Sequence, residues 1–346
     1  MTTGRSRQRS SPPQSSFRGG GTGSNHAAQQ RHAGDVGSRE PDSICNRIET
    51  GRSEWEHLHR DDVTMRIIIS RKGFDSSSGG IPSPILPDGT IVSFPIPEPK
   101  SAARSGVAYD ELACGEWGSI GDVAEQLGAK ASVLARGAHV DPDVDPAAAT
   151  RRPGWRPALG QADAALSHLQ NQGVGPGDLF LFFGLFRRVV ERNGRLQWDG
   201  GSPPEHLVFG WLRVGSVVTP SDPGWSSLSL THGDHPHVTH PYGATNGLLL
   251  SADQCDMAPD QRASGLHRRW CQARRLTRPN GPPSEWRLPR RCHPGEAGVE
   301  ASYHGKRDRW RVEGDTVVLR TVGRGQEFVV EATPAWREWG SQILNS

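Results

Sequence analysis

Apolar residues are distributed very unevenly along the chain. Residues 1–64 have no apolar period of 2 or 3.6 and are rich in Ser, Arg, Gly, Gln and Pro. Such a segment buries too little surface to offset the entropy of ordering it. At Met65 the pattern changes abruptly, because three isoleucines at 67–69 form a short buried strand. We therefore predict a disordered leader over residues 1–64, consistent with a true start at Met65, and a folded domain over residues 65–344.

Four almost continuously apolar runs predict the centre of this domain. Runs of this kind are typical of strands that are covered on both faces. They lie at residues 66–70, 177–184, 205–218 and 245–252. We expect them to form one central sheet.

Helical spacing and capping signals predict three helices around that sheet. Ser119 and Asp122 have the spacing of a capping box and begin a helix over 119–127. A leucine and alanine stripe predicts a second helix over 157–171, and Pro334 lies near the first turn of a third. The fold class is therefore α+β: a single mixed-sheet domain with flanking helices after the leader.

The remaining segments are expected to be less regular. The prolines of 82–99 indicate extended connections and turns, with a hairpin turn at 87–90. Little periodicity is found from 261 to 311, which favours short helices and surface loops. Alternating residues over 310–332 predict a last hairpin that turns at 323–325.

Composition excludes several classes of protein. The net charge is only +2, so no overall field indicates nucleic acid or membrane as a partner. Five widely spaced cysteines without a CxxC pair argue against a zinc ribbon and a disulfide framework. The chain has no apolar run of membrane-spanning length and no signal-peptide core. We expect a soluble cytoplasmic protein that does not contact a membrane.

The loop at 70–80, SRKGFDSSSGG, is the first candidate for chemistry. Backbone N–H groups of a flexible loop, together with Arg71 and Lys72, can bind an anion such as phosphate. Neither GxxxxGK[ST] nor GxGxxG is present. The alternative is a polar turn with a solvated arginine–aspartate pair, and both interpretations remain open.

The stretch HVDPDVDP at 139–146 is the second candidate. Asp141, Asp143 and Asp145 alternate along an extended segment and can share one side with His139. Crowded carboxylates bind a cation or raise one another's pKa towards acid–base use. An EF-hand is excluded by its missing glycine and glutamate. A proline-rich acidic surface loop is the favoured alternative.

Histidines and tryptophans supply two further signals. In an extended HGDHPHVTH segment (232–240), His235 and His237 would project to the same face, where imidazoles can bind a metal or a substrate; a solvent-facing loop is the favoured alternative. Tryptophans interleaved with arginines can form a groove for phosphates and stacked bases, although codon bias and ordinary packing explain them nearly as well. These residues are Trp270, Trp286, Trp310, Arg268, Arg269, Arg274, Arg275, Arg290 and Arg291.

The motifs MRIIISRKGFDSSSGGIPSPILPDGT, HVDPDVDP, GWRPALGQADAALSHLQNQGVGPGDLFLFFGLFR, HLVFGWLRVG and HPHV occur in this order between Met65 and Ala252. Together they resemble the nucleotide modification associated domain 3 family. Its members are linked, mainly by genomic association, to bacterial and phage systems that alter bases in DNA. The resemblance implies a role with nucleotides or DNA without naming a reaction, and it has no counterpart for the leader.

A narrower resemblance supports an alternative of another class. GVGPGDLFLFFG followed by HLVFGWLRVG is similar to two strands of PUA-like barrels, including modules that read modified bases. Such a hairpin is common in unrelated β-rich domains. The alternative function is therefore a PUA-like module that binds modified bases without catalysis.

The leading hypothesis is an enzyme that acts on a nucleotide or nucleobase, with a nucleotide or DNA as its partner. Its catalytic candidates are Asp75, Asp141, Asp143, His235 and His237, and its nucleotide- or phosphate-binding candidates are Arg71, Lys72, Ser76 and Ser77. The sequence assigns no metal ligand and identifies neither a cofactor nor an oligomeric state. An enzyme requires the segments 71–75, 139–143 and 235–237 to meet in one pocket, whereas a binding module requires an aromatic cage and a basic rim.

Overall fold

The computed structural model describes residues 64–346 except 101–106, 241, 243–244 and 324–326. Apart from Thr64, the predicted leader lies outside the described residues. The strands are β1 (Arg66–Arg71), β2 (Ser83–Ile85), β3 (Ala158–Ala162), β4 (Leu179–Arg192), β5 (Arg195–Trp198), β6 (Glu205–Val218), β7 (Asn246–Ser251), β8 (Ser264–Leu266), β9 (Glu285–Pro289), β10 (Trp310–Glu313), β11 (Thr316–Arg320) and β12 (Glu327–Glu331). The α-helices are α1 (Ile120–Gln126), α2 (Ala131–Leu134), α3 (Asp163–Asn171), α4 (Leu228–Thr231), α5 (Pro236–Thr239), α6 (Pro294–Ala297) and α7 (Pro334–Leu344).

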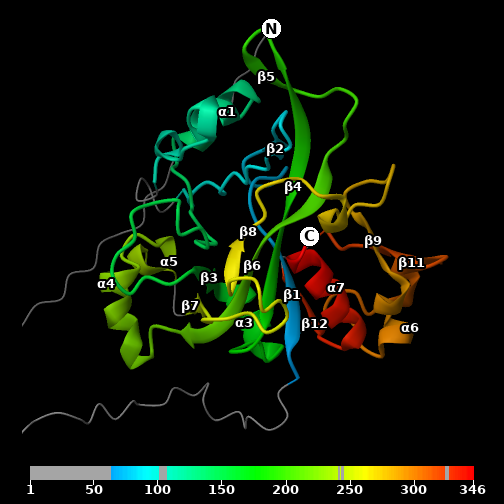
Figure 1. Cartoon of the computed structure of the whole chain (residues 1–346). Coiled ribbons are helices and arrows are strands. Elements are labelled where there is room, and N and C mark those ends of the chain that lie inside the picture. Colours follow the sequence, from blue (N-terminus) through cyan, green and yellow to red (C-terminus); the bar gives the residue numbers. More distant parts are fainter. Residues whose placement is uncertain (1–63, 101–106, 241, 243–244, 324–326) are drawn as a thin grey trace, which may run out of the picture. The chain divides into compact units, whose positions relative to one another are not determined.

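A nine-stranded mixed sheet forms the centre of the described part (Figure 1). Its main path runs β12-β1-β4-β6-β7-β3, and β2, β5 and β8 pair with β4 or β6 beside that path. β1 is parallel to β4, whereas β12, β6 and β7 are antiparallel to their neighbours. The four apolar runs are thus confirmed as strands of one sheet, and the α+β prediction is correct.

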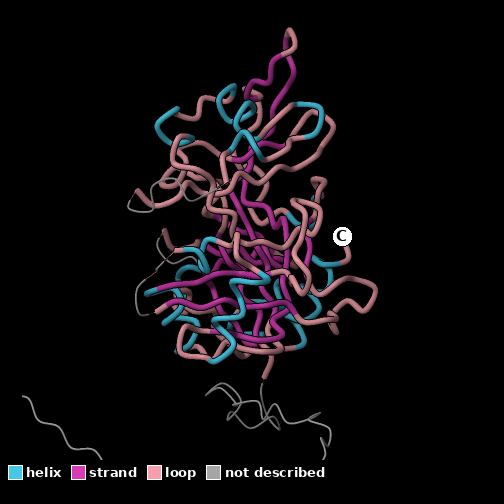
Figure 2. Tube along the Cα trace, turned by 90° about the vertical axis from the view of Figure 1, so that its left-hand side faces the viewer, coloured by secondary structure: helices cyan, strands magenta, loops and turns pink. Residues whose placement is uncertain are grey.

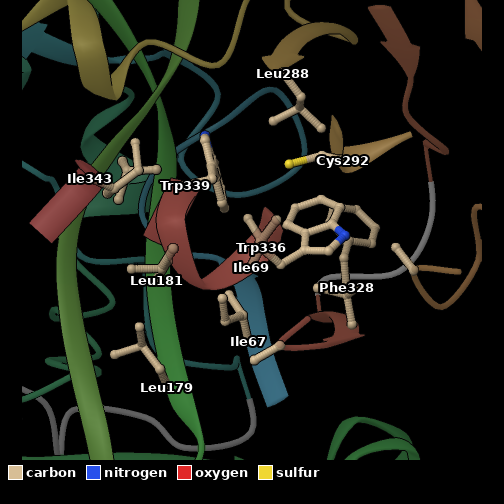
Figure 3. Close-up of a cluster of buried hydrophobic side chains, with 14 of the residues drawn as sticks. Ile67, Ile69, Leu179, Leu181, Leu288, Cys292, Phe328, Trp336, Trp339 and Ile343 are labelled. Atoms are coloured by element: carbon tan, nitrogen blue, oxygen red, sulfur yellow. The ribbon is translucent and has the colours of Figure 1, made fainter. Parts of the chain in front are cut away.

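Alternate residues of β1 enter opposite cores, as the strand period requires. Ile67 and Ile69 face a cluster that includes Trp336 and Trp339 of α7, and Figure 3 shows these side chains together. Ile68 faces a second cluster built around β4, β6 and β7. Both faces of β1 are therefore buried, which explains the unbroken apolar run in its sequence.

α1 covers an extension of the sheet. Ser119 Oγ accepts from the backbone N–H of Asp122, and the Asp122 carboxylate accepts from the backbone N–H of Ser119, which confirms the capping box. Val123 and Leu127 pack against Val189 and Leu196 at the far end of β4 and on β5. β4 and β5 form an antiparallel hairpin whose tip extends beyond the other strands (Figures 1 and 2).

The predicted helix over 157–171 is wrong in its first half. Residues 158–162 form β3, which pairs with β7, and the helix begins at Asp163, whose φ of 50° marks the turn between them. Leu159 is fully buried in the sheet core. Its three-residue spacing to Ala162 imitates a helical stripe, and tertiary pairing decides the conformation.

The predicted last hairpin is also wrong. β11 pairs with β9 and β10 in a separate three-stranded sheet, whereas β12 pairs with β1. Of its predicted turn, residues 324–325 lie outside the described residues. The alternating residues do form strands, but β12 is buried and pairs with β1 of the central sheet instead of returning along β11. The segment from 261 to 311, for which short helices and loops were expected, also contains the strands β8 and β9. The sequence pattern does not predict these two strands.

Candidate functional site

The two end strands of the main sheet path meet beside the end of β1. Glu327, the first residue of β12, lies opposite Ser70 of β1, and its Oε1 accepts a hydrogen bond from Ser70 Oγ at 3.1 Å. Gln161 of β3 donates its side-chain N–H to the same oxygen at 2.9 Å. The sheet therefore curls until polar groups from distant parts of the chain are adjacent.

This curl encloses a polar cavity of about 220 Å³. The cavity is lined by residues from the ends of β1 and β3, from the HVDPDVDP segment and from α5. They include Arg71, Lys72, Asp75, Ser78, His139, Asp141, Gly160, Gln161 and His237. The structure thus brings together the three segments that the enzyme hypothesis requires.

Asp141 is the centre of charge in the polar cavity. Its Oδ2 lies 3.7 Å from Lys72 Nζ, and its Oδ1 accepts from the backbone N–H of Gly160 at 2.6 Å. His235 Nε2 lies 3.4 Å from Oδ1. Burial favours the neutral carboxyl, but the positive charge of Lys72 and the contact with His235 outweigh it and lower the pKa of Asp141 below its ordinary value. The group is therefore an anion at neutral pH and a weak base.

His235 and His237 lie on a short helix and not on an extended segment. His235 is the N-cap of α5, and its Nδ1 accepts from the backbone N–H of His237 at 3.2 Å. Both side chains are buried, so the favoured prediction of a solvent-facing loop is wrong. Because α5 packs on β3 and β7, both rings still reach Asp141 without the alternation that was expected.

The protonation state of His237 follows from its surroundings. Its Nδ1 lies 2.8 Å from the side-chain oxygen of Asn246. An amide oxygen only accepts, so we place the proton on Nδ1 and a lone pair on Nε2. Burial lowers the pKa of His237 to about 4 despite the nearby Asp141. His237 thus faces the cavity as a neutral imidazole.

His139 is oriented in the same way by a buried carboxyl group. Its Nδ1 lies 3.2 Å from Glu98 Oε2 and 3.2 Å from the hydroxyl of Tyr242. The Tyr242 ring stacks on His237 at a centroid distance of 4.3 Å. Burial raises the pKa of Tyr242 above its ordinary value, so this hydroxyl stays neutral. His139 and His237 are held with their ring centroids 5.3 Å apart.

The loop at 70–80 has a compact internal structure. Asp75 Oδ1 accepts hydrogen bonds from the backbone N–H groups of Ser77 and Ser78, and Oδ2 pairs with Arg71 at 2.9 Å. The arginine–aspartate pair of the alternative interpretation is present, although Asp75 is buried and not solvated. Arg71 and Asp75 border the polar cavity, whereas Ser76 and Ser77 line a different one.

The remaining aspartates of HVDPDVDP do not line the polar cavity and have arginine partners of their own. Asp143 accepts from Arg151 and from the indole N–H of Trp155, and Asp145 pairs with Arg268 at 2.7 Å. Of the three carboxylates, only Asp141 lines the polar cavity, although all three border the larger cavity described next. The favoured surface-loop interpretation is also wrong for Asp141 and Asp143, because both side chains are largely buried.

A larger, mostly apolar cavity of about 570 Å³ adjoins the polar one. Lys72, Gly73 and Asp141 border both. Its apolar lining includes Leu86, Val92, Leu112, Trp117, Phe209 and Leu266. The two cavities thus place an apolar space of ligand size next to a buried ionic centre.

The tryptophans do not form the predicted groove. Trp286 and Trp310 are core residues whose indole N–H groups donate to His206 Nδ1 and His304 O. Trp270 donates to Glu205 and is covered by Arg188. Ordinary packing is therefore the correct explanation for these residues.

Several residues of the site carry no signal in the sequence. Glu98 lies in a proline-rich connection, and Glu327 lies in a strand buried on both faces. Gln161 lies within the residues that the sequence predicts as a helix, but it is buried on β3. Tyr242 stands in a segment of ordinary loop composition, and Asn246 is the polar residue that begins β7.

Within the described residues, no helix combines the length and the apolar character needed to cross a membrane. No curated protein and no solved structure matches the chain significantly. The family model of nucleotide modification associated domain 3 matches residues 66–331, which include β1 to β12 and every residue of the polar cavity. The match covers most of the chain, and its family is associated with nucleotide modification. The chain therefore belongs to the nucleotide modification associated domain 3 family.

Proposed function

We infer that this protein is an enzyme that acts on a nucleotide or on a nucleobase in DNA. The observation that carries the proposal is the position of Asp141. This buried anion borders both cavities, between Lys72 and His237. A ligand in the apolar cavity would therefore meet charged and imidazole groups at one end.

The apolar cavity suits a nucleobase, and the polar cavity holds the side chains that would act on it. A nucleobase has flat apolar faces and polar edges, and Leu112, Trp117 and Phe209 offer apolar contact. Lys72 can donate to a polar edge of the base. His237 is the better proton acceptor of the site, because its Nε2 carries a lone pair whereas Asp141 is a weak base. Ser76 and Ser77 are left out of the proposal because they line another cavity.

The alternative is a module that binds a modified base without catalysis. The apolar cavity with Trp117 favours it, since stacking on an aromatic ring is sufficient for binding. The buried ionic centre favours the enzyme, because a binding module has no need for a desolvated carboxylate.

Nucleoside analysis distinguishes the two functions. Purified protein is incubated with nucleotides, plain DNA and DNA that carries modified bases, and the nucleosides are measured by mass spectrometry. The enzyme predicts a new or lost nucleoside with the wild type and at least a hundredfold slower conversion with Asp141→Asn. Asp234→Asn is the control, since Asp234 is exposed, pairs with Arg152 and lines neither cavity. Retention of modified DNA without any conversion would favour the binding module.

A further inference from the structure

A group of three potential metal ligands lies within the polar cavity. His139, Asp141 and His237 each offer one ligand atom, and these atoms all lie within 4.8 Å of one another. Two imidazoles and a carboxylate are a common ligand set for Zn²⁺ and Fe²⁺. The three residues come from two segments that β3 and α5 bring together, so sequence spacing does not reveal them.

The hydrogen bonds of the two imidazoles leave the correct nitrogen atoms free for a metal. Glu98 Oε2 near His139 Nδ1, and the Asn246 oxygen near His237 Nδ1, both act as acceptors. Each therefore fixes the proton on Nδ1 and leaves the lone pair of Nε2 for coordination. Metal-binding histidines are usually held in this way by a carboxylate or carbonyl group behind the ring.

His235 has the opposite arrangement and is not a ligand. Its Nδ1 accepts from the backbone N–H of His237, so its proton lies on Nε2, which faces Asp141 Oδ1 at 3.4 Å. His235 and the N–H of Gly160 both orient the Asp141 carboxylate. Ligand-supporting contacts are therefore present for all three residues of the group.

The local charges point to the same conclusion. Asp141, Glu98 and Glu327 are buried carboxyl groups within this cluster, and the cation in contact with two of them is Lys72. Within the described residues, Glu98 Oε1 is buried without a hydrogen bond, and His240 Nε2 lies 4.0 Å from it. Buried acidic groups of this kind are normally neutralised by cations. A divalent ion would offset the excess of acidic groups.

We propose that His139, Asp141 and His237 bind one divalent transition-metal ion, with Zn²⁺ or Fe²⁺ as the class of metal. Imidazole ligands favour these ions over Mg²⁺ and Ca²⁺. Three protein ligands leave positions open for water or substrate, which is typical of catalytic and not of structural sites. The ion would lie at the junction with the apolar cavity, since Asp141 borders both spaces. The proposal concerns the same pocket as the proposed function but does not depend on turnover. In the metal-bound protein Nε2 of His237 is a ligand, so it accepts a proton only in the metal-free form.

Metal binding to the full chain tests this proposal directly. Metal-free protein is titrated with Zn²⁺ and with Mg²⁺ by calorimetry, and bound metal is counted after dialysis. We expect one Zn²⁺ per chain and at least a hundredfold weaker binding of Mg²⁺. His139→Gln, Asp141→Asn and His237→Gln should each weaken Zn²⁺ binding by at least a hundredfold, and Glu98→Gln by about 10–100-fold.

Matched controls separate the site from other histidines and carboxylates. Asp75 borders the same cavity, and His293 is the N-cap of α6. The variants Asp75→Asn and His293→Gln should both retain full Zn²⁺ affinity. X-ray absorption of the Zn²⁺-loaded wild type, which needs no variant to fold, should show nitrogen and oxygen ligands at about 2.0–2.2 Å. Sulfur ligands at about 2.3 Å, a stoichiometry near zero or unchanged affinity in the Asp141→Asn protein would overturn the metal site. Conversion of a nucleotide by metal-free protein would refute a catalytic metal and leave the proposed function standing.

Discussion

A Cβ atom built on Gly160 would lie 2.1 Å from Cδ2 of His237. The backbone of β3 is therefore in direct contact with the imidazole, and glycine is needed because no side-chain atom fits between them. His237 has little freedom to move away, since it is hydrogen-bonded to Asn246 and stacked on Tyr242. The position of this ring depends on a residue for which the sequence predicts a helix and the structure shows a strand.

Gly160→Ala should displace His237 and destabilise the fold by about 1–3 kcal/mol, the usual range for overpacking. Urea unfolding measures the loss. Gly200→Ala is the control, because nothing lies within 4 Å of its Cβ position. In the double variant Gly160→Ala/His237→Ala the clash is removed, so the combined loss should be smaller than the sum of the single losses. Strictly additive losses would contradict the contact.

Lys72→Met should destabilise the protein by about 3–5 kcal/mol at pH 7, because it leaves the buried carboxyl groups of Asp141 and Glu327 without their cation. Lys306→Met, at an exposed position, should change the free energy of unfolding by less than about 0.5 kcal/mol. Adding Glu327→Gln to Lys72→Met should recover part of the loss. If the Lys72 and Lys306 variants unfold at the same urea concentration, Lys72 is not an essential counter-charge.

The sequence was sufficient to predict the central sheet because its physical cause is local. β1, β4, β6 and β7 are buried on both faces, so each appears as an unbroken apolar run. α1 was equally predictable, since Ser119 and Asp122 cap it within a single turn. The strand at residues 158–162 was not predictable, because the leucine and alanine spacing there fits a helix. Only pairing with β7 makes these residues a strand.

The site was only partly predictable because it depends on how the sheet curls. Lys72, Asp141 and His237 stood out as charged or imidazole groups beside buried segments. The groups that orient His139 and His237, namely Glu98 and Asn246, are unremarkable in sequence. Their roles arise from contacts between residues 41 and 9 positions apart, and no local pattern encodes such contacts.

Leu181→Ala and Leu230→Ala provide a matched pair for testing the core. Leu181 is fully buried beneath α7 (Figure 3), whereas Leu230 is 73% exposed. Truncation at Leu181 should cost about 2–5 kcal/mol because it removes buried methyl groups and leaves a cavity. Truncation at Leu230 should change stability by less than about 0.5 kcal/mol. Equal urea midpoints for the two variants would show that the β4 core is placed incorrectly.

Acid should destabilise the fold well above the pH at which carboxylates protonate. Burial lowers the pKa of His206 and His267 to about 3 and that of His304 to about 4. In the unfolded chain these groups titrate near pH 6.5, so between that pH and the folded values the unfolded state binds more protons. Their contribution to the free energy of unfolding is complete above about pH 6.5, and it is lost as the pH falls towards their pKa values in the folded state.

Between pH 7.5 and 5.5 each of these histidines should remove about 1.4 kcal/mol from the free energy of unfolding. Asp178 acts in the opposite direction, because burial raises its pKa to about 6, but one carboxyl does not cancel three imidazoles. His206→Gln should therefore reduce the pH dependence by about 1.4 kcal/mol over this interval, and urea unfolding at both pH values measures it. Burial is the main reason why His206 resists protonation. The indole N–H of Trp286 acts in the same direction, since it donates to His206 Nδ1 and would face a second donor if that nitrogen gained a proton. A protein that is equally stable at pH 5.5 and 7.5 would contradict this account of the buried imidazoles.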